Sequence, residues 1–170
     1  MLSTERLELR VPEGADMAAL IAVTADDRTR RYLGPQSTPA DQFGRLCRNA
    51  GSWLLYGYGS FVVRPRGSDT VIGSIGVFHS WRGLGEDFDD QAEAGWILHH
   101  DWVGQGLAEE AMREVLRWFS ASHGKRRIVC MISEGNKPSI RMADKLGFRS
   151  LRSATLPDGD AVLLFERTIV

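Results

Sequence analysis

The order of the predicted helices and strands indicates an α/β fold of the α+β type, with one mixed sheet of six to seven strands and helices on both faces. Two observations support this prediction. Residues 60–99 contain three consecutive strand-like segments, which are typical of an antiparallel meander. Residues 91–132 then have the pattern of a strand, a long helix and a strand, and such a crossover joins parallel neighbours. We therefore expect a single domain over residues 1–170, antiparallel at its start and parallel in its middle.

The first part of the chain is predicted to form one strand and two helices. Residues 6–11 alternate apolar and polar side chains, as a half-buried strand does. Pro12-Glu13-Gly14 ends this strand, and residues 15–26 have apolar side chains at helical spacing. A second amphipathic helix is expected over residues 41–55, with Pro39 just ahead of it, where proline is tolerated. Its expected apolar face consists of Phe43, Leu46, Cys47 and Leu54.

The rest of the chain is predicted to supply six strands and two helices. The strands are expected at residues 60–64, 71–79, 91–99, 127–132, 148–153 and 161–169, and the helices at residues 104–122 and 139–146. The first two strands flank a turn at residues 66–69, and the last two flank a turn at residues 156–160. The longer helix has a continuous apolar stripe opposite a charged face, and Gly147 suits the C-cap of the shorter one.

Composition places the chain among ordinary globular proteins. The hydrophobic fraction is 43%, the charged fraction is 25% and the net charge is -1, so no global charge favours nucleic acid or membranes. No apolar stretch approaches the roughly 20 residues of a membrane helix. Cys47 and Cys130 belong to no Cys/His cluster, which argues against a metal site. We interpret both as reduced core residues of a cytoplasmic protein.

The most informative segment is the turn between the strand at 91–99 and the helix at 104–122. Gly104 and Gly106 lack a Cβ atom, so the main chain can approach a bulky anion closely. The first amides of the helix have no internal partner and lie at its positive end. Such a turn can bind phosphate groups, although two glycines can also serve the turn alone. No Walker-type Lys-Ser/Thr and no Gly-x-Gly-x-x-Gly follows, which argues against a nucleoside triphosphatase or a Rossmann site.

Two stretches resemble the GNAT superfamily of N-acetyltransferases. The run from Val103 to Ala108, Val-Gly-Gln-Gly-Leu-Ala, resembles its motif A, Gln/Arg-x-x-Gly-x-Gly/Ala, with Val103 as the one departure. It is especially similar to the branch of ribosomal-protein N-terminal acetyltransferases (RimJ/RimL-like). Residues 136–148 resemble the Asn-x-x-Ser-x-x-x-x-x-Lys-x-Gly-Phe element of the family. The two matches stand in the order that the family requires.

The resemblance implies a GNAT fold whose central strands, 91–99 and 127–132, splay apart, with acetyl-CoA as cosubstrate and no metal. The turn would hold the pyrophosphate on main-chain amides. The strand near Ile97 and Leu98 would pair with the pantetheine arm and polarise the thioester carbonyl. The implied cofactor-binding residues are Ile97, Leu98, Val103, Gly104, Gln105, Gly106, Leu107, Ala108 and Asn136.

The resemblance also implies two catalytic residues. Glu93 matches the acidic position of the branch's Ala-Glu-x-Gly pattern, and we expect it to be the general base, directly or through a water. A salt bridge at the strand end is the structural alternative for Glu93, and His79 and His99 are alternative bases. The tyrosine that many GNAT enzymes use as an acid is missing after motif A, so Ser139 is the matching proton donor. The three tyrosines of the chain are Tyr32, Tyr56 and Tyr58.

The acceptor is the least determined part of the reaction. The loop at residues 85–90 contains four carboxylates that would attract a cationic amine, and residues 32–34 and 53–58 are candidate pocket walls. An amine-bearing peptide with a free α-amine is the first hypothesis for the acceptor. A small amine such as an antibiotic or a polyamine is the second, and a non-catalytic acyl-CoA-binding module is the third. A homodimer would be in keeping with the branch, but nothing in the sequence decides the oligomeric state.

Overall fold

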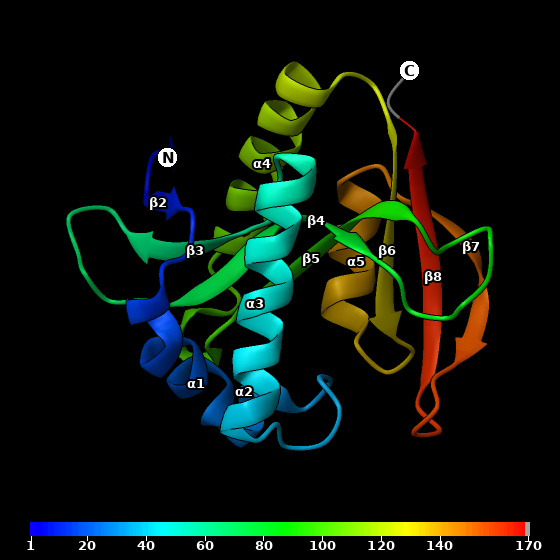
Figure 1. The fold of residues 1–170 in the computed structure, drawn as a ribbon, viewed down its shortest axis with the longest axis horizontal. Helices are drawn as coiled ribbons and strands as arrows, with labels where there is room; N and C mark the ends of the chain where they lie inside the picture. The colour runs from blue at the N-terminus through cyan, green and yellow to red at the C-terminus, as the bar shows by residue number, and fades with distance from the viewer. Residues whose placement is uncertain (169–170) are drawn as a thin grey trace.

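The computed structural model describes residues 1–168, whose strands form one eight-stranded sheet in the order β1-β2-β3-β4-β5-β6-β8-β7. The strands are β1 (Leu2–Ser3), β2 (Leu7–Arg10), β3 (Ser60–Pro65), β4 (Gly73–Ser80), β5 (Gln91–Leu98), β6 (Arg127–Ser133), β7 (Arg149–Thr155) and β8 (Ala161–Thr168). Neighbours are antiparallel except β5 and β6, which are parallel. The predicted mixed sheet is confirmed (Figure 1).

The sheet has eight strands where six to seven are predicted. The additional strand is β1, which pairs Leu2 with Leu9 and Ser3 with Glu8 at the edge of the sheet. A two-residue strand is too short to produce an alternation pattern that sequence analysis could detect. The predicted end of the last strand, Ile169, lies outside the described residues.

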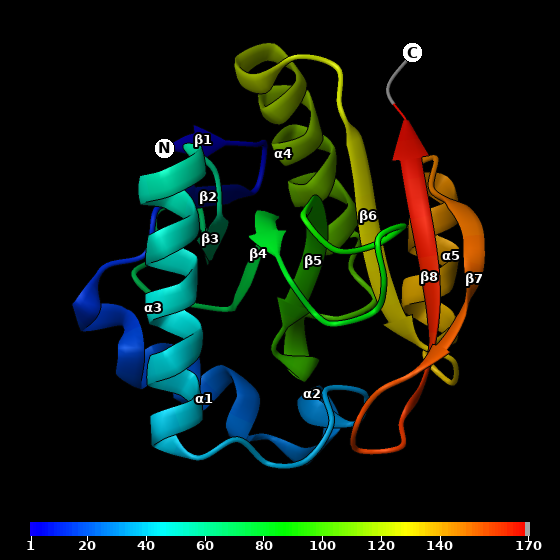
Figure 2. The ribbon, with the colours of Figure 1, turned by 45° about the vertical axis from the view of Figure 1, so that its right-hand side comes forward.

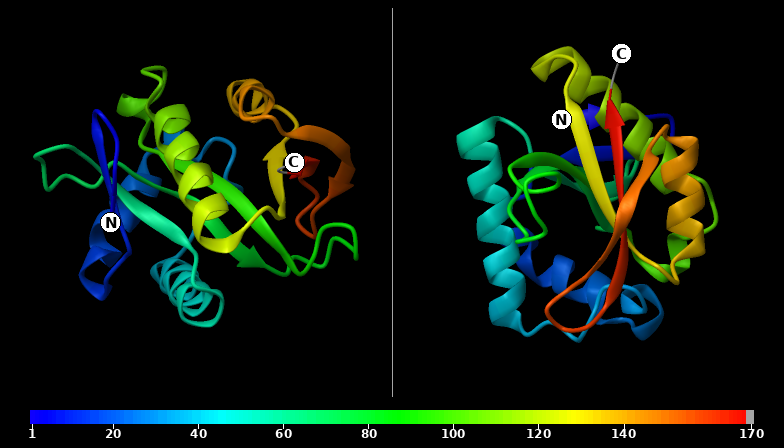
Figure 3. Two further views of the ribbon diagram at one scale, coloured as in Figure 1. Left: turned by 90° about the horizontal axis from the view of Figure 1, so that it is seen from above. Right: turned by 90° about the vertical axis from the view of Figure 1, so that its right-hand side faces the viewer.

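Helices cover both faces of the sheet, as predicted. They are α1 (Met17–Ala25), α2 (Asp27–Arg30), α3 (Pro39–Tyr56), α4 (Leu107–His123) and α5 (Lys137–Lys145). The view from above in Figure 3 shows α4 and α5 on one face and α1 and α3 on the other. The apolar stripe of α4 is buried against the sheet and contains Leu107, Ala111, Met112, Val115, Leu116 and Phe119. Among residues 1–168, no helix combines the length and apolarity needed to span a membrane.

The predicted apolar face of α3 is wrong. Phe43 is 60% exposed, Leu54 is 85% exposed and Cys47 is also exposed, so only Cys130 of the two cysteines is a core residue. The helix instead buries Gln42, which donates to Thr24 Oγ1 at 2.7 Å. It also buries Ser52, which donates to the carbonyl of Tyr58 at 2.6 Å. These polar contacts, together with the packing of Trp53 against Phe61 and Trp118, hold this side of α3 against the protein.

Gly73 begins β4 and lies opposite Leu98 of β5. A Cβ atom at this position would lie 2.2 Å from the Ile97 carbonyl oxygen and 2.6 Å from the Leu98 side chain. We therefore expect Gly73→Ala to lower the free energy of unfolding by about 2 kcal/mol, the usual cost of overpacking. Chemical denaturation measures this change. Gly51→Ala is the control, because that position in α3 has no atom within 4 Å of the added methyl and should gain helix stability. An equal decrease in the free energy of unfolding in Gly73→Ala and Gly51→Ala would contradict the prediction.

Candidate active site

The two parallel strands at the centre of the sheet separate after two residue pairs. β5 and β6 are in register only at Ala92 with Ile128 and at Glu93 with Val129. Beyond this point β5 continues beside β4, whereas β6 continues beside β8 (Figure 2). The predicted splay is therefore present, and within residues 1–168 the facing edges of both strands have no strand partner beyond these two pairs.

The register determines which main-chain groups line the open edge of β5. The amide of His99 donates to the carbonyl of Ile72 at 2.8 Å. Main-chain groups alternate between the two neighbours of a strand, so the amide of Ile97 also turns toward β4. The amides of Trp96 and Leu98 then turn toward β6 and the open edge. Leu98 is thus suitably placed for a main-chain contact with an extended ligand, and Trp96 takes the place expected for Ile97.

The glycine turn after β5 has the geometry of an anion site. Gly104 has φ 83° and Gly106 has φ 76°, in the left-handed region that glycine adopts without steric cost. Within residues 1–168, no hydrogen bond is donated by the amides of residues 104–109, and the first helical bond runs from Glu110 N to Gly106 O at 3.0 Å. Residues 103–106 are exposed, Leu107 is buried and Ala108 is half-buried. Exposed amides at the positive end of α4 can bind a diphosphate.

The turn has a basic neighbour that the sequence pattern does not indicate. Arg6 Nη1 donates to the carbonyl of Gln105 at 3.0 Å, and Arg6 Nε donates to Glu110 Oε2 at 2.7 Å. The two ends of the first contact are 99 residues apart in the chain. No local motif could have predicted this contact, because it depends on how β2 packs beside α4.

Asn136, Ser139 and Trp96 lie together between β5 and the start of α5. Asn136 is the N-cap of α5, and its Oδ1 accepts from the amide of Ser139 at 3.2 Å. Ser139 Oγ accepts from Trp96 Nε1 at 3.1 Å. Because the indole occupies an acceptor position of the hydroxyl, the O–H proton of Ser139 is free to be donated elsewhere. In the described part of the chain, the side-chain N–H groups of Asn136 donate to no protein acceptor.

Glu93 is buried and forms an ion pair. Only 2% of the residue is exposed, and both carboxylate oxygens accept from Arg82, at 2.6 Å from Nε and 2.6 Å from Nη2. Burial alone would lower the pKa of Arg82, but the contact with Glu93 outweighs it and raises this pKa. Side chains alternate along β5, so Glu93 lies on the opposite face from Trp96. The Arg82 contacts occupy one lone pair on each carboxylate oxygen, and a carboxylate has about four such sites in all.

The alternative bases and the acidic loop are engaged in contacts of their own. His79 lies between Tyr58 Oη, at 3.0 Å, and Asp90 Oδ1, at 2.9 Å. His99 Nδ1 accepts from the amide of Asp101 at 3.4 Å. In the loop at 85–90, Asp87 pairs with Arg152 at 2.7 Å, and this guanidinium holds the pKa of Asp87 below its ordinary value. These contacts reduce the charge that the loop offers to an incoming amine.

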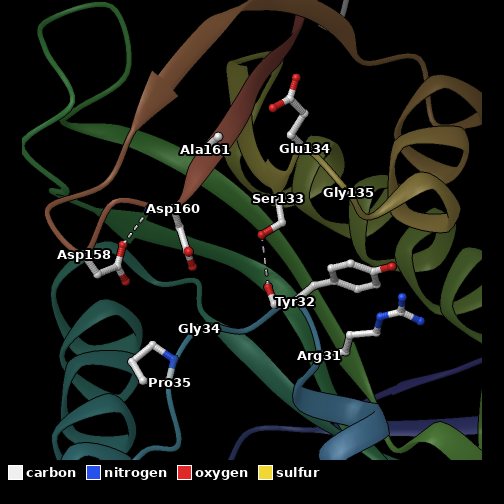
Figure 4. A pocket seen from close by; sticks show the side chains of 10 residues that line it. All are labelled: Arg31, Tyr32, Gly34, Pro35, Ser133, Glu134, Gly135, Asp158, Asp160 and Ala161. Atoms are coloured by element: carbon white, nitrogen blue, oxygen red, sulfur yellow. Dashed lines mark hydrogen bonds between the residues drawn. The ribbon is translucent and has the colours of Figure 1, made fainter.

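A separate cleft lies where β6 ends and β8 begins. Its volume is about 640 Å³. The lining comes from three loops that are distant in sequence (Figure 4), and consists of Arg31, Tyr32, Gly34, Pro35, Ser133, Glu134, Gly135, Asp158, Asp160 and Ala161. The loops meet through the contact of Ser133 Oγ with the carbonyl of Tyr32 at 3.4 Å. Of the predicted pocket walls, Tyr32 and Gly34 contribute to this cleft, whereas Trp53 packs against Phe61 and Trp118.

No metal centre is evident in this site. Within residues 1–168, His, Cys, Asp and Glu side chains form no group of three or more that could hold a metal ion. The functional groups present are main-chain amides, a serine hydroxyl and a buried carboxylate, which can stabilise an oxyanion and transfer protons.

Comparison with known proteins gives a consistent result over nearly the whole chain. The family model described as an acetyltransferase (GNAT) domain matches residues 6–149. The chain is 28% identical to the uncharacterized N-acetyltransferase YnaD of Bacillus subtilis over 150 residues, covering 87% of this chain and 82% of YnaD.

Solved structures agree with this match. A putative GNAT-family acetyltransferase from Bordetella pertussis superposes with a TM-score of 0.88 and 35% identity, covering 98% of both chains. The aminoglycoside acetyltransferase AAC(6')-Ib in complex with coenzyme A has a TM-score of 0.74 and 19% identity, covering 95% of this chain and 94% of that one. At 19% identity, the match to AAC(6')-Ib shows a shared fold.

Proposed function

The chain belongs to the GNAT acetyltransferase family, and from that premise we propose that it transfers the acetyl group of acetyl-CoA to a primary amine by direct attack. The observation that supports this proposal most strongly is the set of amides at 104–109 without internal partners, next to an open strand edge. The turn suits the diphosphate of the donor, and the amides of Trp96 and Leu98 suit the amide-bearing pantetheine arm. Asn136 would donate to the same arm.

In the proposed reaction the amine nitrogen bonds to the acetyl carbon and the carbon–sulfur bond breaks. A main-chain N–H on the open edge of β5 would stabilise the charge that develops on the carbonyl oxygen. The attacking amine group is neutral and loses one proton on becoming an amide, for which Glu93 is the proposed acceptor, directly or through a water. The departing sulfur takes a proton, for which Ser139 is the proposed donor because its O–H is free while Trp96 holds its oxygen. Glu93 and Ser139 lie on opposite faces of the sheet, which suits an attack through the splay.

We propose that the acceptor enters through the cleft between residues 31–35, 133–135 and 158–161. The wall of the cleft carries more negative than positive side chains: the carboxylates of Glu134, Asp158 and Asp160 against the guanidinium of Arg31. The cleft therefore favours a cationic acceptor. This balance supports a small amine with more than one positive charge, such as a polyamine or an aminoglycoside. A protein N-terminal α-amine is the second candidate, and it rests on the motif similarity to the ribosomal-protein branch.

A thiol-release screen over amine classes tests the acceptor. We expect polyamines or aminoglycosides to release CoA faster than peptides with defined N-termini do. Asp158→Asn/Asp160→Asn should raise KM for the acceptor about fivefold, with kcat and KM for acetyl-CoA nearly unchanged, because two exposed attractive charges are lost. Asp144→Asn, an exposed carboxylate on α5, is the matched control and should have no effect. An unchanged acceptor KM in the double variant would contradict this placement, and CoA binding without turnover of any amine would indicate a non-catalytic module.

A further inference from the structure

Arg6, the residue before β2, connects this part of the sheet to the glycine turn through its side chain. Its guanidinium donates to the Gln105 carbonyl through Nη1 and to Glu110 through Nε, and Nη2 lies 2.6 Å from Glu110 Oε2. The main-chain amide of Arg6 also donates to Glu110 Oε1, at 3.0 Å, and Thr4 Oγ1 donates to the same oxygen at 2.5 Å. Arg6 Nη2 is 3.6 Å from the position that a Cβ atom of Gly106 would occupy. The guanidinium thus borders the turn itself.

Charge makes this contact relevant to an anionic ligand. The first turn of α4 contains two carboxylates, Glu109 and Glu110, beside the amides that would receive a diphosphate. Glu109 is paired with Arg113 at 2.8 Å and with Lys145 at 3.3 Å. Glu110 is paired with Arg6. Without these partners, both carboxylates would repel phosphate groups at the helix start.

The local environment keeps Glu110 ionised. Partial burial alone would raise the pKa of Glu110, but hydrogen bonds from Thr4 and from the amide and guanidinium of Arg6 outweigh it and lower this pKa. The carboxylate is therefore negative at neutral pH, and Arg6 is the cation that compensates it. Arg6 also has N–H groups beyond those used by Gln105 and Glu110, because a guanidinium offers five donors.

We propose that Arg6 is a positioning residue for the nucleotide diphosphate end of the donor. It fixes the turn through the Gln105 carbonyl and cancels the charge of Glu110 next to the phosphate-binding amides. This inference rests on the proposed function, since it needs acetyl-CoA as the donor. The proposal predicts that substitution of Arg6 weakens the use of acetyl donors that contain the diphosphate and does not affect donors that lack it.

Steady-state kinetics with acetyl-CoA and with S-acetylpantetheine, which has no nucleotide, tests the proposal. In Arg6→Met, KM for acetyl-CoA should rise about tenfold with kcat changed less than about twofold, as expected on losing one charge-assisted anchor. The kcat/KM for S-acetylpantetheine should stay unchanged. Arg6→Lys keeps the charge, so its KM for acetyl-CoA should lie between those of the wild type and Arg6→Met. Arg6→Met/Glu110→Gln should have a KM for acetyl-CoA closer to the wild-type value than Arg6→Lys has, because the uncompensated carboxylate is then also gone.

Arg117→Met is the matched control, since Arg117 forms an ion pair with Glu114 on the same helix at 2.5 Å but away from the turn. An equal fall in kcat/KM for both donors in Arg6→Met would show a purely structural role and overturn the proposal. An unchanged KM for acetyl-CoA in this variant would also overturn it. If Arg6→Met does not fold, Arg6→Lys provides the test. A ratio of kcat/KM for acetyl-CoA to kcat/KM for S-acetylpantetheine equal to that of the wild type would then overturn the proposal. Failure of the wild-type protein to bind CoA would instead refute the proposed function.

Discussion

Gly106→Val is expected to weaken CoA binding about 100-fold, because the change removes the main-chain geometry on which the diphosphate site depends. Gly106 has φ 76°, and a β-branched residue is strained by roughly 1–3 kcal/mol in this region. The turn would relax to another conformation, and the amides of residues 104–109 would no longer converge. Isothermal titration calorimetry with CoA measures the loss.

Gly67→Val provides the control for this experiment. Gly67 lies in the turn between β3 and β4, has φ 73° and has no atom within 4 Å of an added Cβ. The backbone strain should therefore be similar, while the site stays intact. We expect Gly67→Val to lose stability but to bind CoA like the wild type. Tight CoA binding by Gly106→Val would show that the conformation of the turn is not needed.

Glu93→Gln is expected to lower kcat about 100-fold, which is the contribution of a general base. The same change removes one partner of a buried ion pair and should cost about 2 kcal/mol of stability, less than the ~3–5 kcal/mol of a fully buried pair because Arg82 is partly exposed. Activity must therefore be measured per folded enzyme, in a stopped assay of amine acetylation at a temperature well below the transition.

Arg82→Met separates the two roles of Glu93. This variant frees both carboxylate oxygens and should lose stability as Glu93→Gln does. If Glu93 accepts the proton, Arg82→Met retains activity per folded molecule, since the base is still present. Equal activity of both variants and the wild type, when corrected for folding, would mean that Glu93 and Arg82 form a structural pair alone.

The parts of the fold that depend on local patterns could be predicted from the sequence. The stripe of α4 and the strand pattern of β5 specify their own periodicity, so the crossover and the parallel pair follow from them. The glycine turn is likewise local, because the conformation needed at Gly104 and Gly106 is one that few other residues adopt. These predictions needed no knowledge of distant contacts.

The parts that depend on distant contacts could not be predicted. The side of α3 that faces the protein carries Gln42 and Ser52 as well as Trp53, and the spacing of its other apolar residues does not indicate this side. Arg82 reaches Glu93 from a loop, and Arg6 contacts Gln105 although the two residues are 99 positions apart in the chain. The cleft is built from three loops, each with an ordinary turn composition. Such contacts result from tertiary packing, which short-range patterns do not encode.

The amides of the glycine turn can be observed directly by titrating CoA into the ¹⁵N-labelled protein and recording amide chemical shifts. If these amides bind the diphosphate, the resonances of residues 104–109 should shift most, followed by those of Trp96 and Leu98 on the open edge of β5. Shifts confined to other surfaces, or no change in residues 104–109 at millimolar CoA, would contradict the proposed donor site.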